Sequence, residues 1–398
     1  MIDFNQILEA VANDLDIPDS KRSLAEQRYN AVGTWLSDGY SPNLKPQIYV
    51  QGSFLLGTVI RPYKNQKDAE YDIDLVCQIP YMTKKTSTAA KELKHSIGNR
   101  LKAHAKYKEM LDQEGRRCWT LDYSRDNDVA FHLDILPSVL DSYGTKEATR
   151  LAITTKDKEE NSYTWNSTNP KAFAEWFKQQ SWTMLTEARS FSASDNIEDV
   201  PNFSQKNTLQ RIVQILKRHR DIRFDGKSNA DDAPISMIIT VLAAYLYNHN
   251  ANLFHALADI TKKLTAYSQL LTERYDVLAL SESTRDYHII SRTPDGIWHL
   301  NNPVADENFA ERWHENGNRK AKAFFQWSNW IYEDIVRPIE NGNVASFYNT
   351  CRMLIPDLES RLNSFPSTIQ QALQRNIQYI RALPPRSFFF QRQRKELI

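Results

Sequence analysis

The chain has 398 residues, of which 41% are hydrophobic and 25% are charged, and its formal net charge is +1. This length exceeds what one ordinary compact core needs, so we expect a globular protein with two lobes. The balanced charge gives no reason to expect a stable complex with long duplex DNA. The longest apolar run, ISMIITVLAAYLY, is shorter than the roughly 18 residues of a membrane span, so no membrane partner is expected.

Cysteine usage and the first residues indicate the compartment. The three cysteines, Cys77, Cys118 and Cys351, are spaced neither as a zinc site nor as a disulfide framework. A reducing compartment, the cytoplasm, is therefore expected. Residues 1–14 are acidic and helix-like, which is not the pattern of a signal peptide.

The first 150 residues mix helical and strand patterns and predict an α/β lobe. A short strand is expected to run into a Gly-Ser turn and a short helical segment, and YDIDLVCQI alternates as a strand does. RCWTLDYS and VAFHLDILPSV are expected to pair as neighbours in one sheet. Helices are predicted at residues 3–14, 20–37 and 86–107, and the strand before the turn at residues 47–51.

After residue 150 the pattern becomes mainly helical. Helices are predicted at residues 170–187, 206–222, 234–248, 252–272, 305–335 and 357–382. We therefore divide the chain into a first lobe at residues 1–150 and a mainly helical lobe at residues 151–398. The expected fold class is α+β, with a cleft between the lobes.

Three aspartates are the main candidates for chemistry. Alternate side chains of a strand share a face, so Asp72 and Asp74 point the same way, and His132 and Asp134 do so on a later strand. If the two strands are adjacent, three carboxylates converge and repel one another unless cations neutralise them. Hard divalent cations suit such ligands. The alternative is that these are ordinary aspartates at strand ends.

The Gly-Ser turn at Gly52 and Ser53 favours the catalytic interpretation. Glycine permits close backbone approach, and serine offers a hydroxyl and an N–H group to a phosphate. A strand, this turn and a helix, followed by Asp-x-Asp on a strand and a third aspartate on a later strand, form a specific combination. In it the turn grips the phosphates that the metals also bind.

Two further residues have plausible phosphate-binding positions. Lys217 lies on the polar stripe of a helix with Gln210 and Gln214, although such a stripe can also be a solvated face. Ser236 follows Pro234 and is expected near a helix N-terminus, where it either contacts an anion or caps the helix.

The pieces YVQGSFLLGTVIRP, EYDIDLVCQIP, FHLDILPSV, LQRIVQILKRHRD, APISMIITVLAA and NNPVADENFAERW resemble the nucleotidyltransferase superfamily with a polymerase-β-like core. Within it they resemble the bacterial cGAS/DncV-like nucleotidyltransferases (CD-NTases) of CBASS antiphage systems. The resemblance implies that Asp72, Asp74 and Asp134 bind two Mg²⁺ or Mn²⁺ ions and are catalytic. It places Gln51, Gly52 and Ser53 in the nucleotide-binding turn, with Lys217 and Ser236 anchoring the triphosphate. It also implies that residues 1–150 are the catalytic core and residues 151–398 a nucleotide-binding lobe, with the active site in the cleft between them.

The resemblance also implies a function. A cyclic di- or trinucleotide, expected to contain adenine, would be made from NTPs such as ATP with release of pyrophosphate, and would activate a separate antiphage effector. HORMA-type or ubiquitin-ligase-like regulators are implied as partners. One alternative is a nucleotidyltransferase that makes a linear product or modifies RNA or protein. Another is an inactive nucleotide-binding scaffold.

Overall fold

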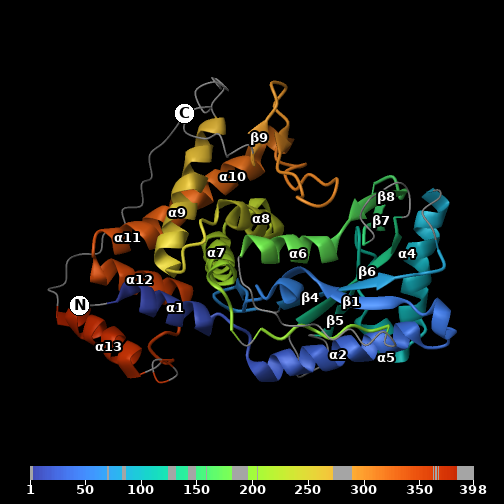
Figure 1. Ribbon diagram of the computed structural model, residues 1–398, viewed down its shortest axis with the longest axis horizontal. Coiled ribbons are helices and arrows are strands. Elements are labelled where there is room, and N and C mark those ends of the chain that lie inside the picture. The colour runs from blue at the N-terminus through green and yellow to red at the C-terminus, as the bar shows by residue number, and fades with distance from the viewer. Residues whose placement is uncertain are drawn as a thin grey trace.

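A computed structural model of the chain describes residues 3–69, 71–82, 87–123, 131–141, 149–157, 159–181, 196–203, 205–271, 289–361, 363, 365 and 367–382. A sheet with its own helices forms one lobe and a group of helices forms the other (Figure 1). The C-terminal segment with Phe388, Phe389 and Phe390 lies outside the described residues. No helix in the described part of the chain is long and apolar enough to cross a bilayer.

The described residues form a mixed six-stranded sheet in the order β1-β4-β6-β7-β8, with β5 also paired to β6. Only β4 and β6 run parallel, and the other pairs are antiparallel. The strands are β1 (Gln47–Gln51), β4 (Tyr71–Gln78), β5 (Trp119–Asp122), β6 (Phe131–Leu140), β7 (Leu151–Lys156) and β8 (Tyr163–Thr168). The adjacency of β4 and β6 is the feature that positions the site.

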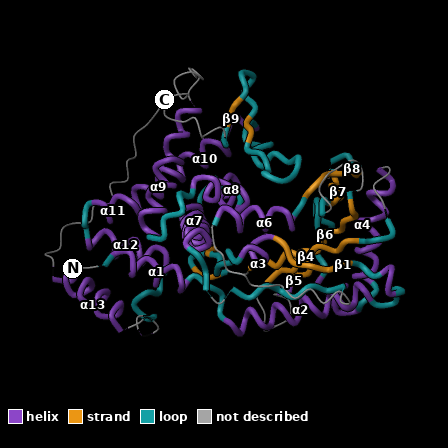
Figure 2. The backbone as a smooth tube through the Cα atoms, in the orientation of Figure 1, coloured by secondary structure: helices purple, strands orange, loops and turns teal. Residues whose placement is uncertain are grey.

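One face of this sheet is covered by helices that precede or interrupt it in sequence. The inward residues of the strands, such as Ile73, Leu75 and Leu133, pack with buried residues of these helices in one core. The helices are α2 (Asp19–Ser37), α4 (Ser87–Lys102) and α5 (Ala105–Met110) (Figure 2). The strand alternation thus leaves the aspartate-bearing face turned away from this core.

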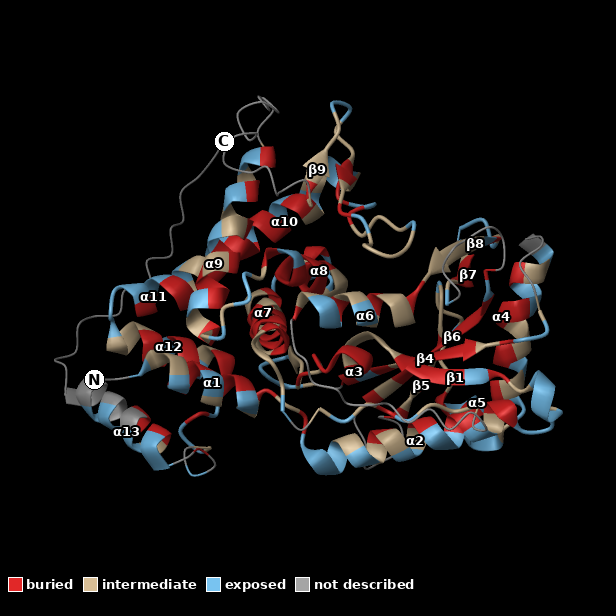
Figure 3. Ribbon diagram, in the orientation of Figure 1, coloured by how far each residue is buried: buried red, intermediate tan, exposed pale blue. Residues whose placement is uncertain are grey.

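The helical lobe has a separate, larger core with α7 at its centre, where buried residues are concentrated (Figure 3). The N-terminal helix also packs here, because Ile7, Leu8 and Val11 belong to this core. The helices are α1 (Phe4–Asp14), α6 (Pro170–Gln180), α7 (Thr208–Phe224), α8 (Ser236–Leu246), α9 (Leu253–Ala266), α10 (Glu315–Ile331), α11 (Arg337–Glu340), α12 (Val344–Leu354) and α13 (Ser367–Ala382). A π-helical turn, η5 (Tyr332–Val336), joins α10 to α11.

The boundary that we placed at residue 150 does not coincide with the edge of the sheet. Strands β7 and β8 follow it and pair with β6 and with each other. Conversely, α1 lies before it and packs in the helical lobe. The reason is that strand pairing and helix packing are non-local, so a change of composition along the chain does not mark where either lobe ends.

Several predicted helices have different bounds. The helix expected at residues 86–107 is divided into α4 and α5, since His104 caps the second helix by accepting from the N–H of Tyr107. The helix expected at residues 305–335 begins only at Glu315 and contains three residues with positive φ, Asn316, Gly317 and Asn318. Among the described residues between 357 and 382, the α-helix is α13 at Ser367–Ala382, and α12 was not predicted. The end of the helix predicted at 170–187 lies partly outside the described residues.

Candidate active site

Strand pairing brings the predicted aspartates together. In the parallel β4–β6 ladder, Asp74 lies directly opposite Asp134, and Asp72 lies opposite His132. The Nδ1 atom of His132 lies 3.2 Å from Oδ1 of Asp72. On the other side of β6, the hydroxyl of Thr120 donates to Oδ1 of Asp134 at 2.5 Å. The predicted shared face therefore exists, and Thr120 and His132 hold two of its carboxylates.

The Gly-Ser turn lies against the same carboxylates. Gln51 ends β1 opposite Asp74, and Gly52 begins the short helix α3 (Gly52–Leu56) with φ of +60°. A Cβ atom on Gly52 would overlap Oδ2 of Asp74. Glycine is required here both because L residues rarely adopt this φ and because the backbone passes so close to the carboxylate.

The turn and the aspartates line a cavity of about 730 Å³ between the sheet and the α7–α8 pair. Seven of the eight predicted site residues line it: Gly52, Ser53, Asp72, Asp74, Asp134, Lys217 and Ser236. Gln51 is the exception within the described lining, although it lies directly opposite Asp74 in the sheet. A cavity of this size falls within the range of small-molecule sites.

The electrostatics of the cavity show an excess of negative charge. Burial, with the neighbouring carboxylates of Asp134 and Asp72, raises the pKa of Asp74 to about 7, and Lys217 opposes this rise. Burial also raises the pKa of Asp134, against the hydrogen bond from Thr120, which lowers it. Such a group of like charges favours the binding of a cation.

The donor set fits a hard divalent cation, because the three aspartates supply only carboxylate oxygens on one cavity wall. Among the described residues, however, no three ligating side chains are already gathered around one point. The hydrogen bonds explain this, since Asp72 is turned toward His132 and Asp134 toward Thr120. Rotation of these two side chains is the adjustment that ion binding would require.

The polar stripe of α7 is not the solvated face that we considered as an alternative. Its amide and ammonium groups are buried and donate to backbone carbonyls of Leu56, the last residue of α3, and of the segment that follows it. Gln210 donates to Leu56, Gln214 to Val59 and Lys217 to Thr58, at 2.8, 2.6 and 3.1 Å. Helix α7 therefore fixes the backbone of this cavity wall.

Lys217 is a buried lysine in the wall of the cavity. It is 5% exposed, and burial, together with the charge of Arg220, lowers its pKa to about 8. Ser236 is the first residue of α8, as predicted, while Pro234 lies just before the helix.

Sequence reasoning missed Arg220, which stands one helical turn after Lys217 and also lines the cavity. Its guanidinium donates to the carbonyl of Pro234 at 2.6 Å and lies 3.4 Å from the Ser236 hydroxyl. The spacing of three residues from Lys217 was the available signal.

A small hairpin closes another side of the cavity. It consists of β2 (Tyr63–Lys64) and β3 (Lys67–Asp68), joined by Asn65 and Gln66, which both have positive φ. The carboxylate of Asp225 accepts from both turn N–H groups, at 2.7 and 3.0 Å. The end of α7 therefore fixes the tip of the hairpin.

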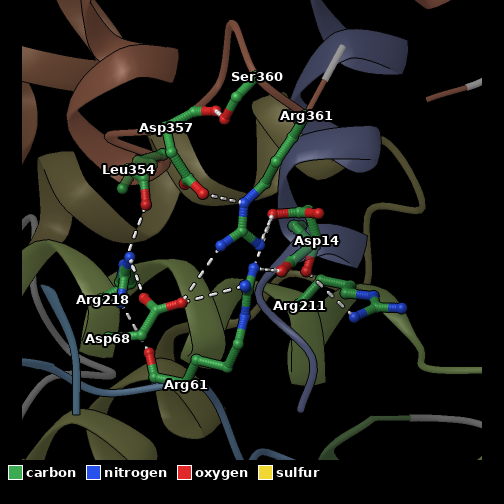
Figure 4. A network of polar contacts seen from close by, with 10 residues as sticks. Asp14, Arg61, Asp68, Arg211, Arg218, Leu354, Asp357, Ser360 and Arg361 are labelled. Carbon is green, nitrogen blue, oxygen red and sulfur yellow. Dashed lines mark hydrogen bonds and ion pairs between the residues drawn. The ribbon is translucent and has the colours of Figure 1, made fainter. Parts of the chain in front are cut away.

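The base of the hairpin is fixed by an ion-pair network that joins distant parts of the chain (Figure 4). Asp68 accepts from Arg218 of α7 at 2.9 Å and from Arg61 at 3.1 Å. Arg61 and Arg361 both also pair with Asp14 at the end of α1. Residues 58–69 are thus held by the N-terminal helix, α7 and the C-terminal part of the helical lobe together.

Comparison with known proteins finds relatives of the same fold. Residues 2–181 match the Second Messenger Oligonucleotide or Dinucleotide Synthetase (SMODS) domain family. A curated relative, the c-di-GMP synthase of Roseivirga ehrenbergii, is 27% identical over 309 residues, which are 77% of this chain and 72% of the relative.

Two solved structures have a similar fold at low sequence identity. The CD-NTase CdnG of Bradyrhizobium diazoefficiens, in complex with GTP, matches with a TM-score of 0.60 and 18% identity, over 95% of this chain and 99% of that one. Escherichia coli CdnC with ATP matches with a TM-score of 0.56 and 14% identity, over 89% and 97% of the two chains.

The fold and the family match define a nucleotidyltransferase with a polymerase-β-like core. The chain resembles the cGAS/DncV-like nucleotidyltransferases in fold, and its residues 2–181 are similar to a second-messenger oligonucleotide or dinucleotide synthetase domain.

Proposed function

We propose that the chain joins two nucleoside triphosphates into a cyclic dinucleotide in the cavity described above, in two successive transfers. The observation that carries this proposal is the convergence of Asp72, Asp74 and Asp134 with the Gly52–Ser53 turn on one cavity. In each transfer a ribose hydroxyl oxygen forms a bond to the α-phosphorus, and the bond from that phosphorus to the bridging oxygen breaks, releasing pyrophosphate.

The side chains of the cavity divide this work. Asp72 and Asp74 would hold two Mg²⁺ or Mn²⁺ ions and Asp134 one of them, beside the attacking hydroxyl. When bound, such ions stabilise the attacking and the leaving oxygen atoms. Ser53, Lys217 and Ser236 would bind the triphosphate, with Arg220 orienting the Ser236 hydroxyl through their contact.

Lys217 is suited to this role because burial makes the charge on its ammonium unfavourable. Burial lowers its pKa, so a triphosphate that supplies negative charge would stabilise the protonated form. The ammonium would exchange part of its contact with the Thr58 carbonyl for a phosphate oxygen.

We also propose which bases the product contains. The name of the curated relative, c-di-GMP synthase, supports guanine, whereas the resemblance led us to expect adenine and ATP. GTP and ATP are therefore both proposed substrates, and a guanine-containing product is the first to look for.

The biological setting is proposed from the family alone. The product would act in the cytoplasm as a diffusible signal that activates a separate effector in a CBASS antiphage system. HORMA-type or ubiquitin-ligase-like proteins are the proposed regulators.

Identification of the product tests the proposal. The purified chain is incubated with all four NTPs and Mg²⁺ or Mn²⁺, treated with phosphatase and analysed by mass spectrometry, with Asp72→Asn as control. A phosphatase-resistant cyclic dinucleotide that the control lacks is the expected result. A linear product with a phosphatase-sensitive end contradicts the second transfer. If pyrophosphate release is also absent when candidate regulators are added, the chain is a scaffold.

A further inference from the structure

Residues 301–311, here called the strap, leave the helical lobe and contact the sheet lobe. The strap follows the short strand β10 (Trp298–His299), and Figure 1 shows this part of the chain extending from the helical lobe toward β8. Its origin is firmly anchored, because Trp298 is fully buried and its ring packs against Trp313, with 5.7 Å between the centroids. The strap thus begins and ends on a fixed base in the helical lobe.

The strap also has a defined conformation of its own. The side chain of Asn308 accepts from the N–H groups of Leu300 and Ala310, at 3.0 Å each, and donates to the carbonyl of Trp298 at 2.8 Å. The N–H of Asn302 donates to the carbonyl of Glu307 at 2.7 Å. These hydrogen bonds fix the backbone of the strap and so hold its acidic side chains in position.

Within the described residues, three ion pairs join the strap to the sheet lobe, and each pairs an acidic residue of the strap with an arginine of the sheet lobe. Glu307 pairs with Arg117 at 2.9 Å, Asp306 with Arg150 at 2.6 Å and Glu311 with Arg116 at 3.9 Å. Arg150 is itself oriented by a 2.8 Å hydrogen bond from its Nε to the hydroxyl of Ser167 in β8.

The attachment points flank the catalytic strand. Arg117 lies just before β5, whose Thr120 donates to the catalytic candidate Asp134 in β6. Arg150 lies directly before β7, which pairs with the far end of β6. The strap therefore joins the helical lobe to β5 and β7, two of the strands that pair with β6, the strand of Asp134.

We propose that the strap keeps the two lobes closed between the two transfers and so retains the linear dinucleotide intermediate. This inference rests on the proposed function, since only a two-step synthesis has an intermediate to retain. Between the two transfers the intermediate has to change its orientation in the site without dissociating. Partly exposed ion pairs suit this task for two reasons. They can break without exposing apolar surface, and each pair stabilises the closed arrangement of the lobes only slightly.

Charge reversal tests the strap through the ratio of linear to cyclic product. Glu307→Arg and Arg117→Glu each place like charges together, and we expect each to raise this ratio about fivefold, as for one partly exposed pair. The rate of pyrophosphate release should stay within about twofold. The double variant restores the opposite charges and should return the ratio to that of the original chain.

Glu315→Arg is the matched control. Glu315 pairs with Arg312 near the start of α10, three residues away in the chain, so its reversal leaves the lobes joined. Its product ratio should not change. An unchanged ratio of linear to cyclic product in Glu307→Arg would contradict the proposed role of the strap. So would a double variant whose ratio does not return to that of the original chain.

A binding measurement separates the strap from the proposed function. The probes are linear guanine and adenine dinucleotide 5′-triphosphates whose terminal ribose is 2′,3′-dideoxy and therefore cannot react. Their dissociation should be about fivefold faster from Glu307→Arg and normal from the double variant. If the original chain binds neither probe, or if the dissociation rate is unchanged in Glu307→Arg, the proposed role of the strap is wrong. A chain that releases no pyrophosphate contradicts the proposed function itself.

Discussion

Replacing Asp74 with asparagine is expected to abolish nucleotidyl transfer and, at pH 8, to make the folded chain more stable. The activity should fall about a hundredfold or more, because a ligand for the ions is lost. The gain in stability arises because burial and the nearby carboxylates raise the pKa of Asp74 from 3.8 to about 7. The charged side chain is thus costly in the folded state.

The sign of the pH dependence follows from this raised pKa. Near pH 4 and below, the carboxyl group binds a proton in both the folded and the unfolded chain. Between pH 4 and 7 only the folded chain keeps it, so the contribution of this group to stability is lost as the pH rises through 7. The folded chain is therefore less stable at pH 8 than it would be with a neutral side chain at this position, and asparagine supplies such a side chain.

Thermal unfolding at pH 4.5 and pH 8 measures this effect. Asp74→Asn should unfold at a higher temperature than the original chain at pH 8 only, and Mn²⁺ should stabilise the original chain more than the variant. Asp72→Asn is the matched control. The side chain of Asp72 is 65% exposed, so water solvates its carboxylate in the folded chain. It should lose activity without a comparable gain in stability. If Asp74→Asn is less stable at pH 8, the assumed cost of its charge is refuted.

Replacing Gly52 with alanine is expected to reduce activity about a hundredfold, with a modest loss of stability. The left-handed conformation at φ +60° costs an L residue about 1–2 kcal/mol. In addition, the new Cβ would overlap the Asp74 carboxylate, so the turn and the aspartate have to move apart. A displacement of about 1 Å at reacting groups is enough for an effect of this size.

Gly39→Ala separates the two causes. Gly39 has φ of +80°, and a Cβ atom there would meet nothing within 4 Å. Both variants should therefore unfold at similar temperatures, whereas only Gly52→Ala should lose turnover in a pyrophosphate-release assay. Full activity in Gly52→Ala would show that the turn does not need its close approach to Asp74.

The central part of the site was predictable because its signals are local. Alternation in YDIDLV places Asp72 and Asp74 on one face, alternation in FHLDIL places Asp134 on the same face as His132, and the Gly-Ser pair marks the turn before them. The adjacency of β4 and β6 had to be assumed, since about fifty residues separate these strands. It is confirmed by the register of Asp74 opposite Asp134.

Elsewhere, non-local contacts decided the structure. Gln210 and Gln214 look like surface residues in sequence, yet they are buried because backbone carbonyls of the cavity wall accept their hydrogen bonds. The helix expected from residue 305 does not begin there because the Asn308 side chain binds neighbouring backbone groups, which competes with helix formation. No periodicity reports such contacts, and the strap was missed for this reason.

The most direct test of the account is a crystal structure of the chain with Mn²⁺ and a non-hydrolysable GTP analogue. The anomalous signal of manganese locates the ions independently of activity. We predict two peaks bound by Asp72 and Asp74, one of them also by Asp134, with the triphosphate between them and the Gly52–Ser53 turn. Analogue bound elsewhere, or no manganese peak at these aspartates, would contradict the proposed active site.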